Sequence, residues 1–166
     1  MARLASGRIP PVVHFHAVST AGAQAITGSQ APDAEGRIRL PTPSQGSWRL
    51  LIGAPGSGTV EVPAQTPGPP VSVMLPPAAR LAVQVPELAT ADVRAEVTVL
   101  GPDGSPVPVL GPGGALRQTW PMVGGKTTIE DLPAGTWIVD ATAGDGRRWS
   151  TTVVAPGAAS VPVILE

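Results

Sequence analysis

Two histidines at a spacing of two residues are the first candidates for chemistry in this sequence. His14 and His16 flank Phe15. Alternate side chains of a β-strand share one face, so the two imidazoles would lie side by side, as in many zinc sites. A third ligand is required, and nothing in the sequence brings Asp33 or Glu35 near. We therefore expect a solvent-facing strand with Phe15 packed inward, and keep a metal site at His14 and His16 as a remote alternative.

The segment 53–58 (GAPGSG) resembles a phosphate-binding loop because it follows an apolar stretch and is rich in glycine. A Walker loop needs lysine directly after its last glycine, and this sequence has Thr59 there. A helix must also follow to offer its N-terminal amides, but the proline-rich stretch 60–70 cannot form one. The serine of the segment lacks the nucleophile-elbow pattern. We expect a connection between strands rather than a nucleotide site.

Glu130 and Asp131 are the one pair of adjacent carboxylates that suggests acid–base chemistry. Neighbouring residues of a strand point to opposite faces, so these two would not act on one substrate. No Ser–His–Asp arrangement is indicated either. The sequence therefore predicts a protein that is not an enzyme and that needs no cofactor.

Trp120 and Trp149 are the candidates for ligand binding. Trp120 lies in a glycine-rich stretch before a proline, and Trp149 follows a pair of arginines. An exposed indole face stacks well on a sugar ring, so a carbohydrate platform is one hypothesis. The alternative is that both side chains pack into a core or cover its edge, which is the more common use of such residues in small sandwiches.

The composition limits the class of protein. The 166 residues carry a net charge of −1 and no cysteine, so a basic nucleic-acid interface and a disulfide framework are not expected. Twenty glycines and 21 prolines indicate many turns, while 42% hydrophobic residues favour a folded chain. No apolar stretch is long enough for a signal peptide or a membrane span. Compartment and oligomeric state are not predicted.

An internal repeat organises the chain. Residues 36–48 (GRIRLPTPSQGSW) match residues 125–137 (GKTTIEDLPAGTW) at one constant offset, with Gly46 opposite Gly135 and Trp48 opposite Trp137. We predict two modules, residues 1–77 and 78–166, with a weaker and possibly incomplete first copy. Its opening strand is short, either truncated or supplied by another module. The paired tryptophans and glycines are predicted to belong to the structural core.

Alternating apolar residues predict that both modules are built from strands. The pattern follows each repeat tryptophan and recurs near the end of each copy. Turn signals recur every 8 to 12 residues or so, the spacing typical of sandwiches. We therefore expect an all-β fold, two tandem antiparallel β-sandwiches of prealbumin-like or Ig-like type with roughly seven strands each. The segment 85–92 is expected to form at most one helical turn, and Pro162 fits only an edge strand.

The second copy resembles the carboxypeptidase regulatory-like domain. The resemblance rests on residues 125–139 (GKTTIEDLPAGTWIV), the turn at 145–147 and the apolar alternation that follows. The family is similar to transthyretin-like and Cna-B-like sandwiches. Its usual tyrosine is tryptophan at both sites here, and Pro43 stands where the second copy has Leu132. The resemblance implies a sandwich fold and transfers no catalytic residue.

The expected function is therefore that of a structural or interaction module without catalysis. It would act as a spacer or scaffold within a larger bacterial envelope or secreted protein, with a protein or a polysaccharide as partner. Envelope or extracellular location is expected only if the chain is part of a longer precursor. Carbohydrate binding is the alternative function.

Overall fold

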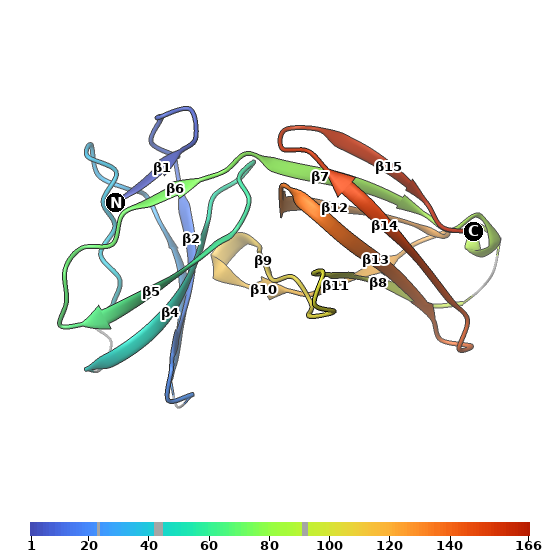
Figure 1. The fold of residues 1–166 in the computed structure, drawn as a ribbon, viewed down its shortest axis with the longest axis horizontal. Coiled ribbons are helices and arrows are strands. Elements are labelled where there is room, and N and C mark those ends of the chain that lie inside the picture. The colour runs from blue at the N-terminus through green and yellow to red at the C-terminus, as the bar shows by residue number, and fades with distance from the viewer. Residues whose placement is uncertain (23, 42–44, 91–92) are drawn as a thin grey trace.

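The computed structural model describes residues 1–22, 24–41, 45–90 and 93–166 and forms two lobes that follow one another along the longest axis of the molecule (Figure 1). Strands dominate both lobes, which confirms the predicted all-β class. Within the described residues the helical segments are two single turns, η1 (Pro86–Leu88) and η2 (Pro112–Gly114). Pro43, one of the residues compared in the repeat, lies outside the described residues.

Residues 1–75 build a four-stranded antiparallel sheet and a small parallel pair. The order of the larger sheet is β3-β2-β4-β5. Its strands are β2 (Val13–Ser19), β3 (Ala25–Gln30), β4 (Gly46–Gly53) and β5 (Val60–Thr66). Opposite lies β1 (Ala2–Leu4), which pairs in parallel with β6 (Val73–Leu75). The alternation in β4 turns Trp48, Leu50 and Ile52 toward the core between the two sheets.

Residues 78–164 build a four-stranded and a three-stranded sheet. The orders are β11-β8-β13-β14 and β12-β7-β15. The strands are β7 (Ala78–Gln84), β8 (Ala95–Leu100), β11 (Thr119–Met122), β12 (Lys126–Pro133), β13 (Gly135–Ala143), β14 (Arg148–Ala155) and β15 (Ser160–Ile164). A short pair, β9 (Val109–Leu110) with β10 (Leu116–Arg117), lies between the lobes (Figure 1). Pro162 lies in β15, at the edge of its sheet, as its missing N–H requires.

Two strand pairs are parallel, a feature that the expected antiparallel pattern did not include. In each lobe the first and the last strand lie side by side, β1 with β6 and β7 with β15. The remaining named strand pairs are antiparallel. The parallel pairs arise because the chain crosses to the second sheet and returns before it leaves the lobe.

The described hydrophobic core falls into two clusters. One contains residues from Ala2 to Leu75 and the other residues from Ala79 to Leu165. Only Pro76 and Pro77 separate β6 from β7, so the connection between the clusters is short and stiff. In the described part of the chain no helix has the length and apolarity needed to cross a membrane.

Candidate functional site

Trp120 and Trp149 lie in the second hydrophobic cluster. Trp120 comes from β11 and Trp149 from β14, and their exposed fractions are 5% and 7%. Arg147 places its guanidinium 5.5 Å from the centre of the Trp149 ring. A sugar platform needs an indole face that is open to solvent, and these two indoles are buried in the core.

His14 and His16 share one face of β2, as expected for alternate residues, but that face is largely covered, with His14 buried and His16 half-buried. His14 is 8% exposed, and its Nδ1 lies 2.5 Å from Ser29 Oγ on β3. Nδ1 of His16 is buried and has no hydrogen-bond partner among the described residues. No group of three His, Cys, Asp or Glu in the described part of the chain is arranged to hold a metal ion.

The repeat residues take different places in the two lobes. Trp48 is 2% exposed inside the first core, whereas Trp137 is half-buried at the rim of the second. The Trp137 Nε1–H donates to the carbonyl of Pro133 at 3.0 Å. A Cβ on Gly135 would lie 2.6 Å from the Trp137 ring, so this turn requires glycine. Gly46 has a φ of +139° and open space around it, so there the requirement is conformational.

The glycine-rich segment 53–58 joins β4 to β5 and lies against the other lobe. The Gly56 N–H donates to Asp131 Oδ1 at 2.8 Å, and the Gly58 N–H donates to the Pro76 carbonyl at 2.9 Å. A Cβ on Gly58 would lie 2.7 Å from Cα of Pro133, so the two lobes touch backbone to backbone. The segment is a contact between the lobes and is followed by a strand, as expected.

Glu130 and Asp131 separate at a register shift in β12. Glu130 is exposed and pairs with Arg80 on β7 at 3.7 Å. Asp131 has a φ of +59° and turns toward the first lobe, where it accepts the hydrogen bond from Gly56. Burial raises the pKa of Asp131 above its ordinary value, more than the hydrogen bond lowers it.

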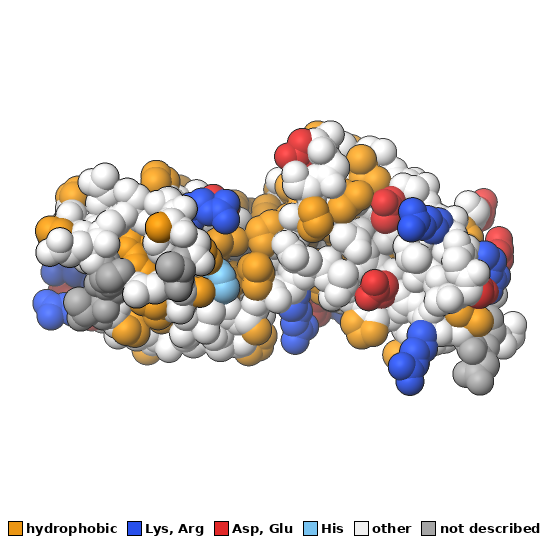
Figure 2. Space-filling view, turned by 90° about the horizontal axis from the view of Figure 1, so that it is seen from below, with side chains coloured by type: hydrophobic (Ala, Val, Ile, Leu, Met, Phe, Trp, Pro, Cys, Tyr) orange, Lys and Arg blue, Asp and Glu red, His pale blue; other side chains and the backbone are white. Residues whose placement is uncertain are grey.

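The segment 109–117 of the second lobe covers the face of the first sheet that carries the histidines. The Leu110 N–H donates to Thr59 Oγ1 at 3.1 Å, and the Gly113 N–H donates to Ser29 Oγ at 3.0 Å. Leu51 and Leu110 are buried but belong to neither core cluster. We call this contact, together with the contacts of 53–58, the junction. Figure 2 shows apolar side chains and a histidine at the waist between the lobes.

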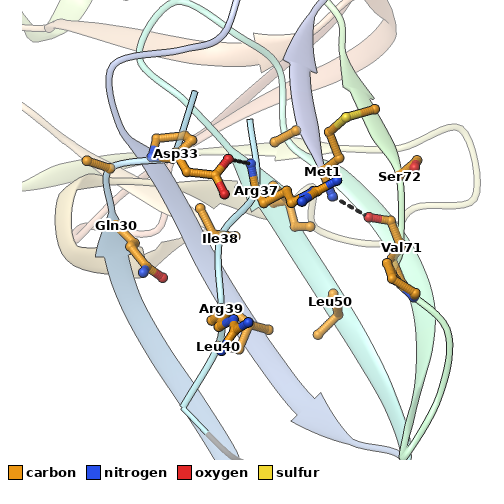
Figure 3. A pocket seen from close by; sticks show the side chains of 15 residues that line it. Met1, Gln30, Asp33, Arg37, Ile38, Arg39, Leu40, Leu50, Val71 and Ser72 are labelled. Atoms are coloured by element: carbon orange, nitrogen blue, oxygen red, sulfur yellow. Dashed lines mark hydrogen bonds between the residues drawn. The ribbon is translucent and has the colours of Figure 1, made fainter. Parts of the chain in front are cut away.

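A groove of about 920 Å³ opens in the first lobe. Leu50 and Ile52 of β4 form its floor. One wall is the extended segment 37–40 and the other is the segment 70–72 that leads into β6 (Figure 3). Arg37 and Arg39 bring two positive charges to a lining that is otherwise mainly aliphatic.

Comparison with known proteins gave neither a matching family model nor a matching curated protein. Among solved structures, the chain is similar to the shaft pilin spaA from Lactobacillus rhamnosus GG, with 13% identity over 92% of this chain and 86% of that chain, and a TM-score of 0.38. A putative adhesin from Bacteroides ovatus gives 7% identity, coverage of 99% and 91%, and a TM-score of 0.33. BcpA, the major pilin subunit of Bacillus cereus, gives 14% identity and a TM-score of 0.37, and the chain covers 41% of it.

Sequence reasoning missed the residues that build the junction and the groove. Gly114 and Asp131 depend on contacts with the other lobe, which no local pattern reveals. Arg37 and Arg39 did carry a signal. They stand where the second copy has Lys126 and Thr128, in a stretch that alternates charged and apolar residues but is followed by prolines.

Proposed function

We propose that this chain is a non-catalytic scaffold of two modules, residues 1–77 and 78–166, which holds two β-sandwiches in one fixed relative orientation. It would serve as a spacer or interface in a larger bacterial envelope or secreted protein. The bacterial setting is suggested by the one lysine against ten arginines in the sequence, and the envelope or secreted setting by analogy with carboxypeptidase regulatory-like domains. Support for that family assignment comes from the buried Leu132 and from the close packing of Gly135 against Trp137.

The observation that carries the proposal is the junction. Flexible linkers leave modules free to reorient, whereas a spacer of defined geometry needs contacts beyond the covalent connection. Here the two-proline connection is supplemented by hydrogen bonds from Gly56, Leu110 and Gly113 across the lobes. Because these bonds come from two separate segments, they resist rotation about more than one axis.

Two adjacent glycines provide a matched test of this rigidity. Gly113 and Gly114 both have a φ of +75°, so alanine strains the backbone at either position. A Cβ at Gly114 would lie 2.2 Å from the Phe15 carbonyl oxygen, whereas a Cβ at Gly113 meets nothing within 4 Å. Gly114→Ala should therefore separate the lobes, and Gly113→Ala should carry only the conformational cost.

Since the chain has no cysteine, spin labels on Glu61→Cys in β5 and Thr152→Cys in β14 report the distance between the lobes. We expect a narrow distance distribution in the parent and in Gly113→Ala, and a broad one in Gly114→Ala. A broad distribution in the parent would contradict the scaffold proposal. Equal narrow distributions in all three proteins would show that the junction is not what fixes the relative orientation of the lobes.

A further inference from the structure

Strand β14 forms an open edge of the four-stranded sheet in the second lobe. It pairs with β13 from Arg148 to Ala155 without a register shift, and no other described strand lies beside it. The Ala143 N–H donates to the Arg147 carbonyl at 2.9 Å, so this pair is hydrogen-bonded. Hydrogen-bonded and non-hydrogen-bonded pairs alternate along an antiparallel ladder. The N–H and C=O groups of residues 148, 150, 152 and 154 therefore point away from β13.

The other edge strands of the three larger sheets carry features that hinder the addition of a strand. Three of them, β5, β11 and β15, contain a proline, which has no N–H to offer: Pro63, Pro121 and Pro162. A register shift interrupts β12 next to Asp131. Strand β3 lies under the segment 109–117, whose Gly113 N–H donates to Ser29. In β14 there is no proline, no glycine and no register shift, so this edge lacks the usual protection.

The first lobe shows the same strand position with its edge closed. There β5 lies beside the strand that carries Trp48, just as β14 lies beside the strand that carries Trp137. Pro63 stands in the middle of β5, and Glu61 pairs with Arg49 on β4 at 3.5 Å. Two lobes with one strand plan therefore differ in whether this edge can accept a further strand.

The exposed side chains of β14 do not repel a neighbouring strand. Ser150, Thr152 and Val154 alternate on the outer face, and Val154 is 68% exposed. The nearby carboxylate of Asp140 on β13 already accepts a hydrogen bond from the Ser150 hydroxyl. Residues 149–155 carry no charge, and the net charge of the chain is −1, so two copies repel each other only weakly.

The strand is complementary to itself when it is turned end for end. A second copy related by a two-fold axis continues the sheet when residues of the same face lie opposite each other. Centred on Thr152, this pairing places threonine beside threonine and Ser150 beside Val154, and it uses the outward N–H and C=O groups of all three. Arg148 then lies past the end of the other copy's β14. Centred on Thr151, the pairing would set the charge of Arg148 against Val154.

We propose that two copies of this chain pair through β14, antiparallel and centred on Thr152, so that their four-stranded sheets join into one. Recognition consists of backbone hydrogen bonds and of contact between the small and apolar side chains of the outer face. The proposal goes beyond the scaffold function, because it requires only the second lobe. Since β14 runs from the far end of that lobe toward the first lobe (Figure 1), the two first lobes would point in opposite directions.

Opposite charges at position 152 test the register. The parent should form dimers at rising concentration in analytical ultracentrifugation. Thr152→Lys and Thr152→Glu should each raise the dimer dissociation constant about five-fold, because like charges would lie directly opposite at the axis. An equimolar mixture of the two variants should restore the dimer. Gln65 is exposed on β5, so Gln65→Lys and Gln65→Glu are matched controls that should behave like the parent.

Proline at the same position tests the backbone bonds. Thr152→Pro should abolish the dimer and leave the fold intact, because the N–H that it removes takes no part in the ladder with β13. Circular dichroism and urea unfolding verify the fold of each variant. A parent that stays monomeric up to millimolar concentration would overturn the proposal and leave the edge to a strand of another protein. A dimer that persists unchanged in Thr152→Pro would overturn it too, since that dimer would use another surface.

A disulfide trap locates the axis. In a hydrogen-bonded antiparallel pair the Cα atoms lie about 5.5 Å apart, a distance that a disulfide spans. Thr152→Cys should therefore form covalent dimers under mild oxidation, and the control Gln65→Cys should not. Equal cross-linking of both would contradict the proposed register.

The dimer and the scaffold are tested separately. When the labels at positions 61 and 152 are used for the lobe distance, labelled protein is diluted in unlabelled parent, so that distances between copies do not contribute. Failure of β14 pairing leaves that distance distribution unchanged. A broad lobe distance with an intact dimer would instead count against the scaffold alone.

Discussion

At the scale of single residues, the two repeat tryptophans make different contributions to stability. Trp48 is enclosed by the first core, whereas Trp137 is only half-buried at the rim of the second. We expect Trp48→Ala to reduce the free energy of unfolding by about 3–5 kcal/mol. Trp137→Ala should cost less, about 2 kcal/mol, because less surface is buried. Urea unfolding measures both, and equal losses would contradict the difference in burial.

The hydrogen bond of the Trp137 indole can be separated from its packing. Trp137→Phe retains an aromatic ring but removes the N–H that donates to Pro133. We expect this variant to lose about 1 kcal/mol of stability, the net value of one such bond. Trp120→Phe is the control, because the Trp120 indole donates no hydrogen bond to a described residue.

The accessibility of Trp120 and Trp149 is directly measurable by fluorescence. The part of the parent's emission that is missing in Trp120→Phe or in Trp149→Phe should be blue-shifted and weakly quenched by acrylamide, because both rings lie in the second core. Trp137 should give the most accessible emission of the four tryptophans. Strong quenching of Trp120 or Trp149 would restore the carbohydrate platform as a hypothesis and would justify a glycan panel.

At the scale of the elements, the register shift in β12 places a half-buried carboxylate, Asp131, whose protonation affects stability. The pKa of Asp131 is raised by burial, so the folded state holds a proton on this group at pH values where the unfolded state does not. The stabilisation that this proton provides is therefore fully present below about pH 4, the ordinary pKa of an aspartic acid. It is lost as pH rises through the raised folded pKa.

The variant Asp131→Asn should remove this dependence. Asparagine tolerates a positive φ and keeps an oxygen that accepts from Gly56. We expect the stability of the variant relative to the parent to increase as pH rises from 4 to 7. The exposed carboxylates Asp33, Asp103 and Asp145, whose pKa values are lowered, remain in both proteins and cancel in the difference. A constant difference across this range would contradict the assigned burial.

The strands themselves were largely predictable. Alternation around Trp48 and Trp137 predicted β4 and β13, and the glycine turn between residues 143 and 147 predicted the hairpin that joins β13 to β14. The helical turn η1 also falls within the expected segment. Parallel pairing of the first and last strands was not predicted, because alternation identifies which face is buried but not which strand lies alongside.

At the scale of the whole molecule, the junction links the stability of the two lobes. Leu110 belongs to the second lobe but packs beside Gly53 of the first sheet, where a Cβ would lie 3.7 Å from it. We expect Leu110→Ala to cost about 2–3 kcal/mol and to separate one calorimetric transition into two. The control Leu116→Ala, in the neighbouring strand but 40% exposed, should leave a single transition. Two transitions in the parent would show that the lobes unfold independently.

Neither the junction nor the groove was predictable in this form. The segment 109–117 is rich in glycine and proline and has no apolar period, so nothing local indicates that it covers another sheet. The repeat did suggest a short opening strand. The groove depends on the separation of segments 37–40 and 70–72, which is a property of three-dimensional packing.

The parallel pairing of first and last strands has a mechanical consequence. Tension applied between the start of β7 and the end of β15 pulls these two neighbours in opposite directions along their common axis. Their hydrogen bonds are then loaded together in shear instead of being opened one after another. Five residue pairs join β7 to β15, whereas three join β1 to β6. Under stretching, the first lobe should therefore give way before the second.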